Sequence, residues 1–312
     1  MEKSSFAVFF FSFCFFLTST ALAQSRMSTS LPYSIPDQQI QPLVKLVDAR
    51  FQKALEKRLR QNPRWSELIT RKKMAVGLVD ISNPAKVKYA RVNGPVMMYA
   101  ASLPKLAILL AANQALEDGV LIATPEINHD MRIMISKSNN AAATRMIDRI
   151  GMERIQAVLK DPRYQLYDRE RGGGLWIGRR YSKQSKRIPE PILGLSHAAT
   201  VTQVCRFYYL LAMGKLVSRE RCSEMLESLR DPEINHKFVN SLHEIVPDAT
   251  LYRKSGTWQN WHSDSVLVWG PNWRRYIVVG LIEAPDGEQI LRDLIPAVEE
   301  VLKLNQLTIS KK

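Results

Sequence analysis

The sequence has few cysteines and histidines, and it has no apolar run long enough for a confident membrane span. Its 312 residues include only three cysteines and five histidines. The histidines show no zinc-type spacing with one another or with the cysteines, so we expect no metal site, and no motif predicts a cofactor. The chain has no internal repeat or low-complexity tract, and 46% of it is hydrophobic, which is typical of a globular protein with a sizeable core.

The N-terminus is typical of an exported protein. Lys3 precedes an apolar run at residues 6–17, which is followed by a small-residue A-x-A cleavage site that ends at Ala23. We therefore expect a signal peptide at residues 1–23, a polar tether at residues 24–38, and a periplasmic or secreted protein. An uncleaved N-terminal anchor is the alternative, although the apolar run is short for a membrane span.

Positive charge is in excess, with a formal net charge of +14. A basic surface favours anionic partners. The sequence contains no zinc finger, no RNA-binding aromatic motif and no isolated basic helix, so we expect no nucleic-acid partner. An exported basic protein would instead meet anionic polymers of the cell envelope.

Cleavage of the signal peptide would leave two cysteines, Cys205 and Cys222. An exported pair can form a disulfide. The two residues lie on successive expected helices, so pairing is geometrically possible but is not implied. Two free thiols in the core remain an equal alternative.

The hydrophobic patterns place strands at both ends of the chain and helices in the middle. This order predicts an α+β fold, with a five-stranded antiparallel sheet flanked by terminal helices and an inserted all-helical lobe. We expect one domain at residues 39–308, with a sheet lobe at 39–95 and 248–308 and a helical lobe at 96–247. The expected strands are 74–81, 86–92, 250–257, 263–269 and 275–283, and the expected helices include 40–59, 102–119, 124–136, 141–150, 200–213, 219–229, 234–242 and 289–304.

The segment at residues 163–195 differs from its surroundings. It contains three consecutive glycines at 172–174, and five basic residues with no acidic residue between Arg179 and Arg187. No Gly-Lys-Ser/Thr follows the glycines, which argues against a phosphate-binding loop. We expect a long loop or hairpin on the surface, and loops of this length in compact domains are often functional.

A serine and a lysine stand at the start of the most apolar helix. Serine is a preferred N-cap and proline suits the first turn, so we expect Ser102 to cap this helix, with Pro104 just inside it. Residues three apart share a helix face, so Lys105 can reach the Ser102 hydroxyl. A lysine base beside a serine hydroxyl forms an activated nucleophile. The alternative is an ordinary cap followed by a solvated lysine.

Two further polar motifs follow along the chain. Ser138-Asn139-Asn140 lies between two expected helices, and Lys254-Ser255-Gly256-Thr257 ends an expected strand. The glycine lets a substrate backbone approach the strand closely, and the lysine and hydroxyls can hold a carboxylate. The alternatives are an ordinary loop and an ordinary strand end.

The three motifs in this order resemble the S-x-x-K, S-x-N and K-T/S-G motifs of the penicillin-recognising serine hydrolases. Within that superfamily the chain looks most like the class A β-lactamases, over about residues 40–305. This resemblance implies that Ser102 attacks an amide carbonyl and that Lys105 takes its proton or orients the relay. It also implies that Ser138 passes a proton towards the leaving nitrogen, with electrostatic support from Lys254.

The resemblance assigns substrate binding to the remaining motif residues. Asn140 would hydrogen-bond the substrate amide, and Ser255 and Thr257 would bind its carboxylate beside Gly256. The backbone N–H groups of Ser102 and Thr257 would form the oxyanion hole, which is commonly a large catalytic contribution.

The sequence departs from the class A pattern in two places. Asn139 replaces the usual aspartate, and the E-x-x-L-N motif that supplies the deacylation base is missing. Glu190-Pro191-Ile192-Leu193-Gly194 is the nearest approximation, so Glu190 is a candidate base. Because a general base contributes on the order of 10²–10⁴ in rate, an enzyme without one would keep its acyl-enzyme for longer.

Three functions therefore remain open. The leading one is hydrolysis of a β-lactam amide, and the second is a D-alanyl-D-alanine peptidase or another amidase that lacks an efficient deacylation glutamate. In both we expect a monomer acting on a small β-lactam or a peptidoglycan-like acyl substrate. The third is a non-catalytic protein that binds the envelope through its basic face. His262 is a further candidate for lining the cleft, and Trp176 and Trp258 could stack on a substrate.

Overall fold

The structure is a computed structural model that describes Met1 and residues 30–182, 186–271 and 273–309. Beyond Met1, the expected signal peptide and the first part of the expected tether lie outside the described residues. Among the helices that are described, none combines the length and the apolar character needed to cross a membrane.

Five antiparallel strands form the central sheet, as predicted. Their order across the sheet is β2-β1-β10-β9-β8, so the two N-terminal strands meet the last strand of the chain. The pairing of β1 with β10 sets Met74 opposite Ile282. The strands are β1 (Met74–Asp80), β2 (Lys88–Val92), β8 (Thr250–Trp258), β9 (Trp261–Trp269) and β10 (Arg275–Glu283).

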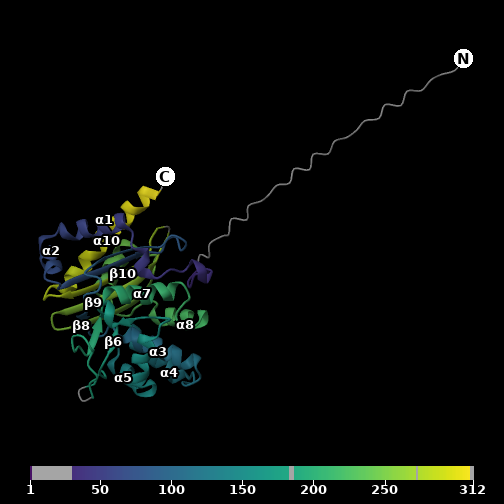
Figure 1. Ribbon diagram of the computed structural model, residues 1–312, viewed down its shortest axis with the longest axis vertical. Helices are drawn as coiled ribbons and strands as arrows, with labels where there is room; N and C mark the ends of the chain where they lie inside the picture. The colour runs from purple at the N-terminus through teal and green to yellow at the C-terminus, as the bar shows by residue number, and fades with distance from the viewer. Residues whose placement is uncertain (2–29, 183–185, 272, 310–312) are drawn as a thin grey trace.

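Apolar layers cover both faces of the sheet. Alternate residues of a strand point to opposite faces, and Val76 and Leu78 of β1 belong to one core cluster whereas Ala75 and Val79 belong to the other. The first cluster also contains the buried sides of the terminal helices, which Figure 1 shows together on one side of the sheet. These helices are α1 (Ala49–Arg60), α2 (Pro63–Thr70), α9 (Phe238–Ile245) and α10 (Gly287–Ile309).

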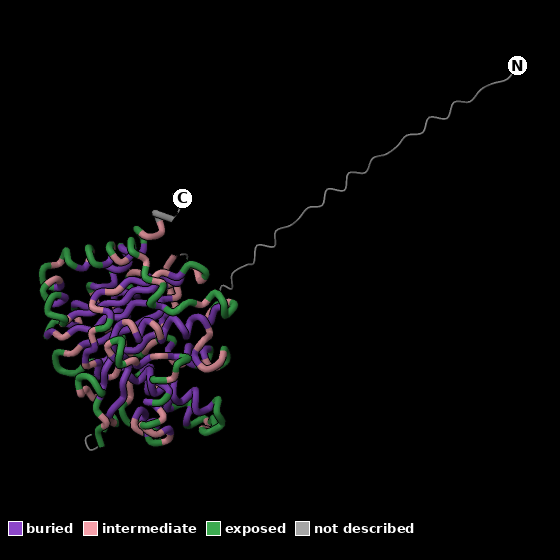
Figure 2. The backbone as a smooth tube through the Cα atoms, in the orientation of Figure 1, coloured by how far each residue is buried: buried purple, intermediate pink, exposed green. Residues whose placement is uncertain are grey.

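The middle of the chain forms the helical lobe beyond the other face. Its first helix, α3, is buried from Lys105 to Leu116, and Figure 2 shows the interior as a continuous buried region. A helix that is apolar nearly all round belongs in the centre of a bundle, and four other helices of the lobe pack against it. The helices of the lobe are α3 (Lys105–Glu117), α4 (Pro125–Ser136), α5 (Asn140–Ile150), α6 (Met152–Lys160), α7 (Val201–Ala212) and α8 (Arg219–Leu229).

The expected helix at residues 40–59 is shorter than predicted. Two 3-10 turns, η1 (Asp37–Gln39) and η2 (Leu43–Leu46), precede it, and α1 begins only at Ala49. Pro42 disfavours helical backbone at the residue before it, and the Asp48 side chain caps α1 by accepting from the Phe51 N–H. The short helix α2 was not expected from the hydrophobic pattern.

The segment at 163–195 was expected on the surface, and this was wrong for much of it. Many of its apolar residues, among them Leu166, Leu175 and Trp176, are buried, whereas Ile192 and Leu193 are exposed. It contributes one 3-10 turn and short strands that pair within the lobe, because chain this apolar gains more from burial than from exposure. These are η3 (Arg169–Arg171), β4 (Tyr167–Asp168), β5 (Gly173–Gly174) and β6 (Trp176–Ile177), with β6 paired to β7 (His197–Ala199) and β7 to β3 (Met98–Tyr99).

Cys205 and Cys222 are both free and buried. Cys205 lies where α7 crosses β1 most closely, since a Cβ on Gly77 would come within 2.5 Å of its Sγ. Cys222 donates from its thiol to the Leu216 carbonyl at 3.0 Å. The open question of a disulfide is thus answered in favour of two core thiols.

Candidate active site

Ser102 lies in the turn that leads into α3, and it is not the N-cap of that helix as expected. The helix begins at Lys105 with Pro104 as its N-cap residue. Proline disfavours helical backbone at the preceding residue, so the helix cannot extend back through Leu103 to Ser102. Ala101 adopts a φ of 49°, a left-handed conformation that turns the chain sharply just before Ser102.

Lys105 is completely buried beside Ser102. Its Nζ lies 3.2 Å from Ser102 Oγ and donates to the Ser138 carbonyl at 2.6 Å and to Asn140 Oδ1 at 2.8 Å. Burial lowers the pKa of this amine to about 7. A group with this pKa is partly neutral near pH 7, so it can accept the proton of the serine hydroxyl.

The loop between α4 and α5 brings Ser138 to the same amine. Ser138 has a φ of 53°, and the side chain of Asn139 caps α5 by accepting from the Ala142 N–H at 2.9 Å. The amide at Asn139 therefore holds the loop through a helix cap, without the charge that an aspartate would bring. Asn140, the first residue of α5, is thereby turned towards Lys105.

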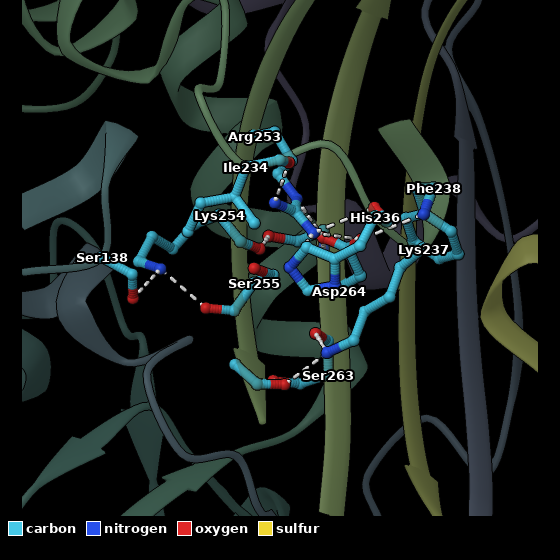
Figure 3. A network of polar contacts seen from close by, with 12 residues as sticks. Ser138, Ile234, His236, Lys237, Phe238, Arg253, Lys254, Ser255, Ser263 and Asp264 are labelled. Atoms are coloured by element: carbon cyan, nitrogen blue, oxygen red, sulfur yellow. Dashed lines mark hydrogen bonds and ion pairs between the residues drawn. The ribbon is translucent and has the colours of Figure 1, made fainter. Parts of the chain in front are cut away.

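Lys254 on β8 approaches Ser138 from the sheet side, as Figure 3 shows. Its Nζ donates to Ser138 Oγ at 2.9 Å and to the Ser255 carbonyl at 2.7 Å. Burial, and then the charge of Lys105, lower the pKa of Lys254 well below its usual range. Ser138 Oγ lies 3.3 Å from Lys105 Nζ, so one hydroxyl bridges two amines and can relay a proton between them.

Gly256 explains how closely β8 approaches the serine. A Cβ at this position would lie 2.4 Å from the Ala100 carbonyl oxygen and 2.6 Å from the Ser102 backbone nitrogen. Backbone atoms cannot yield as a flexible side chain can, so any other residue would push β8 away from Ser102. The glycine therefore brings the strand edge, with Ser255 and Thr257 on either side, next to the serine.

Lys237 is a site residue that the sequence did not reveal. It precedes α9 with a φ of 55°, its side chain is completely buried, and burial lowers its pKa to about 8. Its Nζ donates to Thr257 Oγ1 and to the Gly256 carbonyl, both at 2.7 Å. A lone lysine at the edge of a weak helical pattern gives no signal of this contact.

A buried ion pair fixes this corner of the sheet (Figure 3). Asp264 on β9 accepts two hydrogen bonds from Arg253, at 2.7 and 2.9 Å, and one from the Phe238 N–H at 3.1 Å. Its carboxylate thus joins β8, β9 and the start of α9. Asp264 is thus paired with Arg253. Among the described residues, no carboxylate forms a salt bridge with Lys105, Lys237 or Lys254.

Tyr181, from the segment at 163–195, covers the amine of Lys105. Lys105 Nζ lies 4.5 Å from the centre of the tyrosine ring, and the hydroxyl donates to the Ala101 carbonyl at 3.1 Å. The ring of His197 lies 4.5 Å away and supports it. Burial raises the pKa of Tyr181, so the ring stays neutral. Nothing in the local sequence predicts this contact, because the tyrosine and the carbonyl that it contacts lie 80 residues apart in the chain.

Glu190 is buried elsewhere in the same segment. It accepts from the Ile192 N–H at 2.9 Å, from the Leu193 N–H at 2.6 Å and from the Tyr167 hydroxyl. These partners close a tight turn. None of these partners is one of the residues described above around Ser102 and Lys105. The structure therefore brings the other proposed site residues together without Glu190.

The three remaining aromatic candidates differ in their surroundings and exposure. His262 is 8% exposed and packs against the start of α10, since a Cβ on Gly287 would lie 2.6 Å from its Cδ2. Trp176 is a core residue at 1% exposure, whereas Trp258 is 57% exposed beside Thr257. Of the two tryptophans, Trp258 is therefore the accessible one.

Comparison with protein families gives one match. Residues 123–301 match the model described as the beta-lactamase enzyme family, which is more than half of the chain. A search of curated proteins finds no match.

Solved structures share the fold at low identity. A beta-lactamase from Sphaerobacter thermophilus DSM 20745 is 18% identical with a TM-score of 0.61, and the match covers 81% of this chain and 97% of the beta-lactamase chain. A class A beta-lactamase from Bacteroides cellulosilyticus DSM 14838 is 14% identical with a TM-score of 0.60, covering 82% and 99%. A mutant of PBP-A, solved as its acyl-enzyme complex with penicillin G, is 17% identical with a TM-score of 0.58, covering 87% and 98%.

Proposed function

Because the chain belongs to the beta-lactamase enzyme family and is a hydrolase, we propose that it forms an acyl-enzyme at Ser102 with the amide of a β-lactam or a peptidoglycan-like acyl substrate. One observation carries the proposal. Lys105 Nζ lies 3.2 Å from Ser102 Oγ, and burial brings the pKa of that amine to about 7. A neutral amine in this position is a base for the serine hydroxyl.

The acylation step follows from these contacts. Lys105 takes the Ser102 proton as Oγ attacks the amide carbonyl, and the carbonyl oxygen gains the negative charge. The proton then passes through Ser138 Oγ to the leaving nitrogen as the C–N bond breaks. The product is an ester on Ser102, and in a cyclic amide the freed amine remains attached to it.

A substrate carboxylate has a matching place at the end of β8. Thr257 Oγ1 already accepts from Lys237, so its own hydrogen is free to point outwards. Lys237, whose pKa of about 8 leaves its amine mostly protonated at pH 7, supplies positive charge, and charge-assisted hydrogen bonds are stronger than neutral ones. Ser255 lies next to Lys254 and completes this carboxylate site.

Release of the ester is proposed to be slow. Hydrolysis needs a base that activates water beside Ser102. Among the described residues the only base in contact with the serine is Lys105, which the Tyr181 ring covers. Glu190 is engaged by two backbone N–H groups and a tyrosine. These contacts favour a peptidase or amidase with a persistent acyl-enzyme over rapid β-lactam turnover. We also propose export to the periplasm or the medium through residues 1–23.

Mass spectrometry of the protein mixed with benzylpenicillin tests the proposal. We expect an adduct of the mass of the whole drug that maps to Ser102 and persists for many minutes, and that is absent from Ser102→Ala. Rapid appearance of hydrolysed drug with no persistent adduct would overturn slow release but not the acyl-enzyme. No adduct and no turnover would overturn the acyl-enzyme, and salt-sensitive polymer binding that Ser102→Ala retains would then favour a non-catalytic envelope protein.

A further inference from the structure

Four aromatic rings in mutual contact form a row that ends over the amine of Lys105. The Tyr181 ring, which covers that amine, lies 4.5 Å from the ring of His197, measured between ring centres. The Tyr99 ring lies 6.1 Å from His197 and 6.1 Å from Trp261, edge-on to both. Separations of about 4.5–7 Å are those of favourable aromatic pairs, so the rings hold one another in place.

Strand pairing adds a fifth ring, that of Trp258. This residue ends β8 and lies directly opposite Trp261, across the two-residue turn that leads into β9. Side chains of directly opposed residues lie on the same face of a hairpin, with Cβ atoms about 4.5–5.5 Å apart. Trp258 is 57% exposed, so the row reaches solvent at this end. The aromatic strip thus consists of Tyr181, His197, Tyr99, Trp261 and Trp258.

The hairpin face that carries Trp258 packs against the segment that carries Ser102. Gly256 and Ser263 form an opposed pair on this face. A Cβ on Gly256 would lie 2.6 Å from the Ser102 nitrogen, and the Ser263 hydroxyl donates to the Ala100 carbonyl at 2.9 Å. Alternate residues of a strand share a face, so Trp258 follows Gly256 on it, about 6–7 Å further along. The aromatic strip therefore runs alongside the serine.

The order of residues along β8 determines which part of a substrate meets the aromatic strip. Ser255 of the proposed carboxylate site comes before Gly256, which abuts Ser102, and Trp258 comes after it. Because β8 is an edge strand, an extended substrate can lie along it. A penicillin and a peptide C-terminus both carry their carboxylate on the nitrogen side of the amide. The carbonyl side, which stays on the serine as the acyl group, therefore extends towards Trp258.

We propose that the aromatic strip selects substrates whose acyl group ends in an aromatic ring, with Trp258 as the specificity-determining residue. This preference rests on the acyl-enzyme at Ser102 proposed above. The substrate ring stacks on the exposed indole, as aromatic pairs do. A sugar ring would need partners for its hydroxyls, whereas the polar atoms of Tyr181 and His197 are already hydrogen-bonded within the protein.

Acylation rates with two penicillins test this preference. Benzylpenicillin carries a phenylacetyl group, and its acetyl analogue carries an acetyl group on the same bicyclic ring, so the two β-lactam amides are alike in reactivity. By mass spectrometry at equal low concentrations, we expect the unmodified protein to form the benzylpenicillin adduct about tenfold faster. Trp258→Ala should reduce this ratio of rates at least fivefold, and Trp258→Phe, which keeps a stacking ring, should retain most of it.

Trp273→Ala is the matched control. It removes an indole from the turn beyond the other end of β9, where the ring packs under the Arg274 guanidinium at 4.8 Å. Both rates should stay within twofold of those of the unmodified protein. Where Trp258→Ala does not fold, Trp258→Leu keeps the apolar bulk without a flat ring and should also reduce the ratio.

Two results would overturn the preference while the acyl-enzyme stands. One is equal rates for the two penicillins in the unmodified protein. The other is an equal loss of both rates in Trp258→Ala, which would give Trp258 a structural role only. No adduct with either penicillin would overturn the acyl-enzyme and the preference together.

Discussion

At the scale of single residues, Lys105 combines burial with the absence of a counter-ion. Its neutral form is the base, so acylation should rise with pH. We expect the rate of penicillin adduct formation to increase through a midpoint near pH 7 and to level off above it, because deprotonation makes the amine available. Stopped mixing at a series of pH values with mass detection measures this profile.

The control for that profile is Lys105→Arg. A guanidinium stays charged at every accessible pH, so adduct formation should fall by about 10²–10⁴ and lose its midpoint near pH 7. A profile in Lys105→Arg that keeps the original midpoint would show that another group is the base.

The substitution Glu190→Gln tests whether this carboxylate stabilises the fold rather than activating water. Replacing it with Gln puts an amide donor against N–H groups and a tyrosine hydroxyl. We therefore expect the free energy of unfolding, measured in urea, to fall by about 1–3 kcal/mol. The lifetime of the Ser102 adduct should change less than twofold. A much longer lifetime in Glu190→Gln, with stability unchanged, would identify Glu190 as the deacylation base.

At the scale of elements, Asp264 joins two strands to a helix. In Asp264→Asn the Arg253 guanidinium stays buried without its charge partner, which commonly costs about 3–5 kcal/mol. The start of α9 also loses a hydrogen bond, so Lys237 should hold Thr257 less firmly and acylation should need more penicillin. Urea denaturation and the concentration dependence of acylation measure the two effects.

A matched control for Asp264→Asn is Glu67→Gln on α2. Glu67 pairs with Arg71 at 3.1 Å on the exposed surface, where such pairs contribute about 0–1 kcal/mol. Equal destabilisation by the two substitutions would mean that the buried pair has no special role in holding the sheet corner.

At the scale of the whole molecule, acid should lower the stability of the protein before most of its carboxylates titrate. Burial lowers the pKa of His197 to about 4, so between pH 6.5 and pH 4 the unfolded chain binds a proton that the folded chain does not. Stability should therefore fall with pH across this window, by about 2–3 kcal/mol for one fully buried group. His236, with its pKa lowered to about 4, acts in the same direction.

Urea midpoints at pH 7 and pH 4.5 measure this dependence. His197→Gln removes one titrating ring and should flatten the slope. A slope that stays the same in this variant would assign the pH dependence to other groups.

Much of the fold and the three motifs could be predicted from the sequence, because each depends on local patterns. Runs of apolar residues indicated the strands, and Thr124 and Pro125 indicated the start of α4. The catalytic roles of the motif residues stay predictions. Tyr181 and Lys237 could not be found, because their site contacts come from distant parts of the chain. The start of α3 was misplaced because Pro104 outweighs the capping preference of Ser102.

The pairing of β1 with β10 also has a consequence for protein synthesis. On a ribosome, β1 and β2 emerge early, but the strand that completes the sheet beside them arrives only when Ile282 opposite Met74 has been translated. Until then, β1 presents an unpaired apolar edge, which is a template for aggregation. Contacts of such long sequence separation also form slowly. The growing chain therefore carries this unpaired edge for most of its translation.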